Sequence, residues 1–215
     1  MIHFYGYFRS SCAYRCRIAF NLKGVAHDFT SVHLRRNGGE QHAPDFKAIN
    51  PQGLVPSITD GDFQLNQSMA IVEWLDETHP EPPFLPDTPN ERAKVRAFAQ
   101  MIACDIHPLQ NLRVLLYLKN ELGQDDAAKD AWLQRWLGDG LQACDAYIAR
   151  EGTESTFCFG DTPGLAEICL VPQVFSAHRF GVDLSNMPNV TRVYDACQAL
   201  PAFADAAPSK QPDAE

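Results

Sequence analysis

The chain has 215 residues, of which 45% are hydrophobic and 21% are charged, as is ordinary for a globular protein. This length allows one large domain or two small ones, with a core that needs no covalent cross-links. The net charge of −9 argues against nucleic acid as a partner, because phosphate binding needs a surplus of Lys and Arg.

The first eighty residues alternate between strand and helix signals. Residues 2–8 are rich in aromatic side chains and predict a strand, Ser10 and Ser11 are good helix N-caps, and residues 12–22 carry apolar side chains at helical spacing. Gly24 is expected to end that helix in a left-handed conformation. The remaining predicted elements are strands at 27–34, 54–59 and 62–66, a helical turn at 45–49 and a helix over 67–79. This order predicts a small α/β domain with a mixed sheet.

A proline-rich linker follows this α/β region. Residues 80–90 contain five prolines, which exclude a helix there. The rest of the chain is predicted to be mainly helical, and its tail at 204–215 is expected to be poorly ordered. The helical segments are 90–122, 125–150, 162–178 and 188–199. We therefore expect an α/β domain at 1–82 and an all-helical domain at 88–215.

The N-terminus and the cysteines indicate a cytoplasmic protein. The opening MIHFYGYFRSS lacks the pattern of a signal peptide, and no apolar run reaches the ~18 residues of a membrane span, so no membrane partner is expected. The seven cysteines are then expected to be reduced. Cys12 and Cys16 form C-x-x-x-C rather than the C-x-x-C of a dithiol redox site, and no second Cys/His pair lies near them, so no metal site is predicted.

Three stretches resemble the zeta class of soluble glutathione transferases. They are YFRSSCAYRCRIAF at 7–20, CDIHPLQNLRVLLYL at 104–118, and FGDTPGLAEICLVPQVFSAHRFGVDL at 159–184. Together with Leu54-Val55-Pro56 and Gln67-Ser68, the resemblance covers nearly the whole chain. It implies a thioredoxin-like N-terminal domain followed by a helical C-terminal domain, with glutathione as cofactor and a homodimeric assembly. The class includes maleylacetoacetate and maleylpyruvate isomerases, which are both glutathione-dependent.

Ser10, Ser11 and Cys12 are the predicted catalytic residues. They begin the first predicted helix, where free backbone N–H groups and the helix dipole favour an anion such as a thiolate. The serine hydroxyls would lower the pKa of a bound glutathione thiol further by donating to the thiolate. The alternative for the serines is plain helix capping. Cys12 either contacts the bound sulfur, as the resemblance implies and as we favour, or is itself a redox cysteine.

Further positions are expected to bind the rest of glutathione. Val55-Pro56 resembles the cis-proline turn of thioredoxin-like domains, which exposes the backbone of Val55 for pairing with the cysteinyl unit. Gln67 and Ser68 open another predicted helix and could hold the γ-glutamyl carboxylate, although Ser68 is also a candidate N-cap. The resemblance places Gln41 at the glycyl end.

One face of the predicted helix 90–122 is also assigned to the site. His107, Asn111 and Arg113 are spaced by about one turn or less, so they can share a helix face. The resemblance implies that they, and Arg15, contact glutathione. The alternative for His107 is a packing or capping role, and Arg15 could instead be structural near the first helix.

The second substrate implied by the resemblance is a dicarboxylic keto acid. Arginine suits carboxylates because its planar guanidinium donates two parallel hydrogen bonds. Arg9, Arg113 and Arg179 are the candidate substrate-binding residues, although single arginines are more often solvated surface residues.

One stretch departs from the superfamily pattern. Where transferases open a core helix with S/T-x-x-D, this chain has Gly164 and Glu167. Glycine is a tolerable N-cap and Glu at the third helical position suits reciprocal capping, while Thr162 is an alternative cap.

The sequence thus predicts conversion of maleylacetoacetate to fumarylacetoacetate in aromatic catabolism. The alternatives are a maleylpyruvate isomerase of gentisate catabolism, a general glutathione transferase or α-haloacid dehalogenase, and a non-catalytic transferase-like binding protein. A dithiol oxidoreductase is disfavoured by the absent C-x-x-C.

Overall fold

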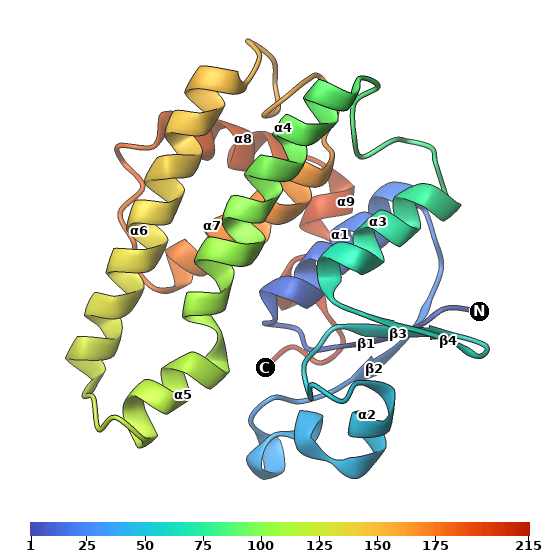
Figure 1. The fold of residues 1–215 in the computed structure, drawn as a ribbon, viewed down its shortest axis with the longest axis vertical. Coiled ribbons are helices and arrows are strands. Elements are labelled where there is room, and N and C mark those ends of the chain that lie inside the picture. The colour runs from blue at the N-terminus through green and yellow to red at the C-terminus, as the bar shows by residue number, and fades with distance from the viewer. The chain divides into compact units, whose positions relative to one another are not determined.

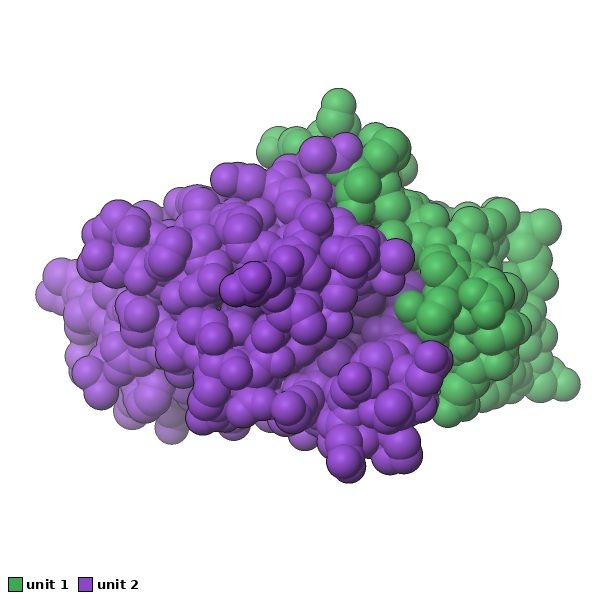
Figure 2. Space-filling view, turned by 90° about the horizontal axis from the view of Figure 1, so that it is seen from above, with its two compact units in different colours: residues 1–83, 200–215 green, residues 84–199 purple.

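The computed structural model describes residues 1–215, which form two compact units (Figure 2). Unit 1 comprises Met1–Pro83 together with Leu200–Glu215, and unit 2 comprises Phe84–Ala199. Residues 200–215 therefore belong to unit 1 together with residues 1–83. The sequence instead predicted that they belong to an all-helical domain at 88–215. None of the helices combines the length and the apolar character that crossing a membrane requires.

Unit 1 is built on a four-stranded mixed sheet with the order β2-β1-β3-β4. Its strands are β1 (His3–Gly6), β2 (Asp28–Ser31), β3 (Ser57–Asp60) and β4 (Phe63–Asn66). Strands β1 and β2 are parallel, and the other neighbours are antiparallel. Helices α1 (Ser11–Lys23) and α3 (Ser68–Thr78) lie on one face and α2 (Pro44–Ile49) on the other (Figure 1). The predicted mixed sheet and thioredoxin-like arrangement are confirmed.

Two local features of unit 1 show how the sequence sets its elements. Gly24 ends α1 with φ 63°, as predicted from its freedom to adopt the left-handed region. The strand predicted at 54–59 instead begins at Ser57, after Pro56. Because β3 pairs on both sides, a proline within it would remove a hydrogen bond from the sheet.

Unit 2 is helical, but its first predicted helix is broken. Instead of one helix over 90–122, the chain forms α4, a π-helical segment, a 3-10 segment and α5. Pro108 has no N–H to continue an α-helix, and Asn111 is extended (φ −60°, ψ 141°). The elements are α4 (Pro89–Gln100), the π segment Met101–Ile106, the 3-10 segment His107–Gln110, α5 (Leu112–Asn120), α6 (Asp126–Glu151), α7 (Leu165–Arg179) and α8 (Pro188–Gln198).

The start of α7 is fixed by a buried carboxylate. Glu167 accepts hydrogen bonds from the backbone N–H of Gly164 and of Cys158, both at 2.8 Å. Gly164 is the N-cap, and a Cβ there would lie 2.4 Å from the carbonyl oxygen of Phe84. The predicted pairing of Gly164 with Glu167 is confirmed, and glycine is required because the backbone of Phe84 approaches so closely.

The C-terminal tail is ordered, contrary to expectation. It forms α9 (Pro201–Ala204) and the 3-10 segment Pro208–Lys210. The Phe203 side chain is fully buried, and its carbonyl oxygen accepts from the Tyr14 hydroxyl at 3.4 Å. Arg17 Nε donates to the carbonyl oxygen of Ala206 at 2.9 Å. One large apolar side chain and the backbone carbonyls around it thus hold a segment whose composition suggested disorder.

Candidate functional site

The N-terminus of α1 presents Ser10, Ser11 and Cys12, all half-buried. Ser10 is the N-cap, and its hydroxyl oxygen accepts from the N–H of Ala13 at 3.2 Å. The first turn holds no acidic residue, so the positive end of the helix dipole is not neutralised. The capping role of Ser10 is therefore real, and its hydroxyl proton is still available to a bound anion.

A buried arginine lies directly behind this helix start. Arg15 is 1% exposed, and its Nη1 lies 3.3 Å from Oγ of Ser68 and 3.8 Å from Sγ of Cys12. Its Nε and Nη2 have no hydrogen-bond partner, and it forms no salt bridge. An uncompensated buried cation is costly unless an anion offsets it, so Arg15 favours negative charge at the starts of α1 and α3.

Arg17, its neighbour on α1, has a structural role. Its Nη2 donates to the carbonyl oxygen of Phe8 at 3.0 Å, and its guanidinium lies over the Tyr14 ring. Burial lowers the pKa of Arg17 to about 10, which still leaves it charged at neutral pH. Arg17 thus connects α1 to the turn that precedes it.

The start of α3 is the second helix N-terminus of the site. Ser68 was a candidate N-cap, but it is the first helical residue, and Gln67 occupies the cap position without a side-chain capping bond. Gln67 has φ 72°, a region that non-glycine residues rarely adopt and that is often found at functional sites. Its Nε2 donates to Oε1 of Gln52 at 2.8 Å. No capping side chain therefore accepts a hydrogen bond from the free N–H groups at the start of α3.

Val55 and Gln41 complete the residues that unit 1 contributes. The Val55-Pro56 peptide is cis, as expected, and the N–H and C=O of Val55 make no backbone hydrogen bond within the chain. Gln41 follows β2 in a loop, is 8% exposed, and its Oε1 has no partner. A Cβ on Gly39, whose φ is 104°, would lie 2.5 Å from the amide of Gln41. The loop thus places a polar group with unused hydrogen-bonding capacity in a tightly defined position.

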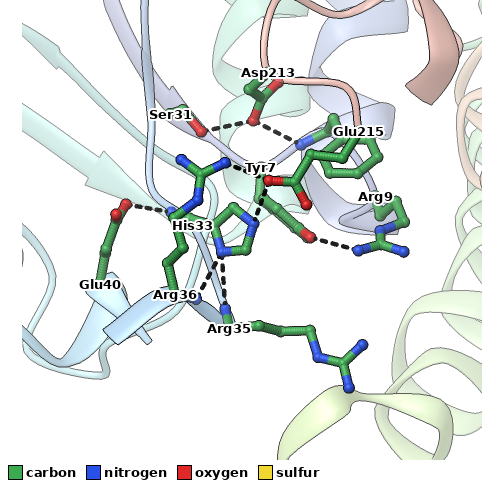
Figure 3. A network of polar contacts seen from close by, with 10 residues as sticks. Tyr7, Arg9, Ser31, His33, Arg35, Arg36, Glu40, Asp213 and Glu215 are labelled. Atoms are coloured by element: carbon green, nitrogen blue, oxygen red, sulfur yellow. Dashed lines mark hydrogen bonds and ion pairs between the residues drawn. The ribbon is translucent and has the colours of Figure 1, made fainter. Parts of the chain in front are cut away.

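Arg9 is held by two aromatic neighbours. Its Nη2 donates to the hydroxyl of Tyr7 at 3.0 Å (Figure 3). Its guanidinium lies 4.8 Å from the ring centre of Phe8. Sequence reasoning named Arg9 but missed Tyr7. Tyr7 and Arg9 meet because residues 7–10 form a turn, which is closed by the hydrogen bond from the N–H of Ser10 to the carbonyl oxygen of Tyr7 at 3.0 Å.

The other predicted site residues belong to unit 2. His107 lies in the 3-10 segment, while Asn111 is the N-cap of α5 and its Oδ1 accepts from the N–H of Arg113 at 3.1 Å. The prediction that these three share one continuous helix face is therefore wrong, because the helix ends between them. Arg179 is exposed at the end of α7, with its guanidinium 4.8 Å from the ring centre of Phe180.

Comparison with known proteins agrees with this arrangement. Residues 4–83 match the family model "Glutathione S-transferase, N-terminal domain". The chain is 47% identical to a probable maleylacetoacetate isomerase of Vibrio cholerae serotype O1 over 98% of its length and 97% of the relative's. It is 48% identical to a maleylpyruvate isomerase of Ralstonia sp over 97% of its length and 98% of the relative's.

Solved structures give the same result. A holo structure of maleyl pyruvate isomerase, described as a bacterial glutathione S-transferase of the zeta class, has a TM-score of 0.96 and 46% identity and covers 99% of this chain and all of its own. The maleylacetoacetate isomerase of Methylobacterium extorquens AM1, solved with malonate and glutathione, has a TM-score of 0.94 and 40% identity and covers 99% of each chain.

The chain belongs to the glutathione S-transferase family. Within that family it is a glutathione-dependent enzyme of the zeta class, in the group of maleylacetoacetate and maleylpyruvate isomerases.

Proposed function

We propose that this enzyme isomerises maleylacetoacetate to fumarylacetoacetate, with the glutathione thiolate held at the start of α1. The observation that carries the proposal is the combination of Ser10, Ser11 and Cys12 at a helix N-terminus with the buried guanidinium of Arg15 behind them, whose Nε and Nη2 have no hydrogen-bond partner. Such an arrangement stabilises a thiolate by hydrogen bonding and by charge. Bound glutathione supplies a nucleophile that adds to the cis double bond and leaves after rotation about the resulting single bond.

Each residue has a definite part in this proposal. Ser11 donates its hydroxyl to the thiolate, with Ser10 and Cys12 beside it. Val55 pairs through its backbone with the cysteinyl unit, and Gln67, Ser68 and Arg15 bind the γ-glutamyl carboxylate at the start of α3. The rest of glutathione is bound by Gln41, His107, Asn111 and Arg113. The carboxylates of the keto acid are bound by Arg9, Arg113 and Arg179. The arginines stabilise the charge that develops on addition, and because the sulfur adds and leaves as the thiolate, no protein general base is required.

Maleylpyruvate is the second candidate substrate. It is favoured by the 48% identity to the Ralstonia enzyme and by the TM-score of 0.96 to a maleyl pyruvate isomerase. Both keto acids carry a maleyl double bond and two carboxylates, so the same arginines serve either. The malonate in the Methylobacterium structure, itself a dicarboxylate, supports a substrate of this chemical class. A homodimer, which we also propose, is tested by light scattering of the purified protein.

An ultraviolet assay tests the function. Purified protein is mixed with maleylacetoacetate or with maleylpyruvate, with and without glutathione, and loss of the cis isomer is followed. We expect turnover only with glutathione and a higher kcat/KM for maleylacetoacetate. Equal rates without glutathione would exclude the mechanism, and a higher kcat/KM for maleylpyruvate would reverse the substrate assignment. A parallel series with α-haloacids and a conjugation electrophile tests the other transferase activities.

Tyr7 offers a narrower prediction about substrate binding. Replacing Tyr7 by Phe removes the hydroxyl that orients Arg9 but keeps the buried ring. Losing a hydrogen bond to a charged group weakens binding by about tenfold, so KM for the keto acid should rise by about that factor. The value of kcat should change little. Steady-state kinetics at saturating glutathione measure both constants. An unchanged KM would show that Tyr7 does not position Arg9 for the substrate.

A further inference from the structure

The C-terminal segment Leu200–Glu215 contacts both loops that carry the unit 1 part of the site (Figure 3). We infer that Asp213 and Glu215 are positioning residues for glutathione binding: Asp213 fixes the turn that leads into Ser10, and Glu215 fixes the loop that carries Gln41. This inference rests on the proposed function for its consequence, though not for its geometry.

Asp213 acts on the turn between β1 and α1. Its Oδ2 accepts from the backbone N–H of Phe8 at 3.1 Å and from the hydroxyl of Ser31 at 2.7 Å. The carbonyl oxygen of the same Phe8 accepts from Arg17 at 3.0 Å. Both backbone polar groups of Phe8 are therefore held by side chains. Since Phe8 lies two residues before the N-cap Ser10, these bonds set the path by which the chain enters α1.

Glu215 acts on the loop after β2. Its carboxylate forms an ion pair with Arg36 and lies 3.2 Å from Nε2 of the buried His33. The other ring nitrogen of His33, Nδ1, accepts from the N–H groups of Arg35 at 3.1 Å and Arg36 at 2.8 Å. Because Nδ1 is an acceptor here, the ring proton is on Nε2, facing the carboxylate. This contact lies outside hydrogen-bond geometry, so Glu215 holds the imidazole, which shapes the first turn of the loop, by electrostatic attraction.

The far end of this loop is connected to His33 as well. The N–H of His33 donates to Oε2 of Glu40 at 2.7 Å, and the N–H of Glu40 donates to the carbonyl oxygen of His33 at 2.9 Å. Gln41 follows directly in the chain. Movement of His33 is therefore transmitted to the residue assigned to the glycyl end of glutathione.

Loss of the Asp213 carboxylate should weaken glutathione binding more than loss of the Glu215 carboxylate. Asp213 is half-buried and makes two hydrogen bonds through one oxygen, whereas Glu215 is exposed and its ion pair with Arg36 is open to solvent. Exposed ion pairs contribute little, while hydrogen bonds to a half-buried carboxylate contribute more. Replacing Asp213 by Ala should therefore weaken glutathione binding about tenfold, and replacing Glu215 by Ala by about threefold or less.

The experiment measures two independent quantities on the full chain. Calorimetry gives the Kd for glutathione, and hydrogen exchange gives the protection of the amides of Phe8, Arg35 and Arg36. For Asp213→Ala we expect weaker binding and faster exchange at Phe8. Asp213→Asn should keep most of the wild-type affinity for glutathione and most of the protection of the Phe8 amide, because its amide oxygen can accept the same two hydrogen bonds. Asp205→Ala, which removes an exposed carboxylate from the same segment, is the matched control and should resemble the wild type.

The outcomes separate this inference from the proposed function. If the wild-type protein binds no glutathione, the proposed function fails, and the exchange data still test the positioning of the loops. If Asp213→Ala binds glutathione like the wild type, or exchanges like it at Phe8, the inference is overturned. Should Asp213→Ala fail to fold, Glu215→Ala remains decisive, because unchanged exchange at Arg35 and Arg36 contradicts the second half of the inference.

Discussion

Replacement of Ser11 by Ala is expected to reduce kcat/KM for the isomerisation about a hundredfold, the usual effect of removing one preorganised donor from a developing or bound anion. Ser11 lies in the first turn of α1, directly after the N-cap Ser10, whose oxygen accepts from the N–H of Ala13. Without the hydroxyl of Ser11, the bound thiol should ionise at higher pH. The measurement is the pH dependence of kcat/KM at saturating glutathione, whose rising limb should move upward.

Ser10→Ala is the matched variant for this experiment. Its main effect should be on stability, a loss of about 1 kcal/mol, because the N–H of Ala13 loses its capping acceptor. Denaturant unfolding of both variants separates the two effects. The assignment of Ser11 as the principal thiolate donor is abandoned if Ser10→Ala loses more activity than Ser11→Ala, or if the pH profile of Ser11→Ala coincides with that of the wild type.

Replacement of Glu167 by Ala is expected to destabilise the protein by about 3 kcal/mol, because it leaves two buried backbone N–H groups without acceptors. Those groups belong to Cys158 and Gly164, which precede α7. Glu167 is 2% exposed, so water cannot replace the lost acceptors. Guanidinium unfolding followed by tryptophan fluorescence measures the change. Glu154→Ala, which removes an exposed acidic side chain from the segment between α6 and α7, is the control and should unfold like the wild type.

The pH dependence gives a second test of Glu167. Burial raises the pKa of its carboxyl, so the folded state binds this proton more tightly than the unfolded state does. The stabilisation from Glu167 is therefore fully present at low pH and declines as pH rises through the raised value. The gap in unfolding free energy between wild type and Glu167→Ala should narrow from pH 4 to pH 8. A gap that widens over this range contradicts the account.

The elements of unit 1 could be predicted because their signals are local. Strand β1, the helix after Ser10 and the cap at Gly24 each follow from neighbouring residues. The contact of Arg15 with Ser68 could not be predicted in this way, since the two residues are 53 positions apart and meet only when α1 and α3 pack on the sheet. Only the family resemblance placed Arg15 at the site.

Two errors have different physical origins. The apolar periodicity on both sides of Pro108 predicts one continuous helix, but the missing N–H of Pro108 ends it after Ile106. The order of the tail had no local signal. Its small and polar residues are typical of a disordered end. It is held to α1 by burial of Phe203 and by hydrogen bonds from Tyr14, Arg17 and Asn21.

Unit 1 is discontinuous in the chain, and this affects how the protein is made. Residues 200–215 leave the ribosome after the whole of Phe84–Ala199, yet they complete the unit begun by residues 1–83. During synthesis, the surface of α1 that receives Phe203 therefore remains uncovered until Leu200–Glu215 has been made. The glutathione-binding unit therefore depends on contacts between distant parts of the chain, such as the hydrogen bond from the N–H of Phe8 to Asp213, 205 positions away.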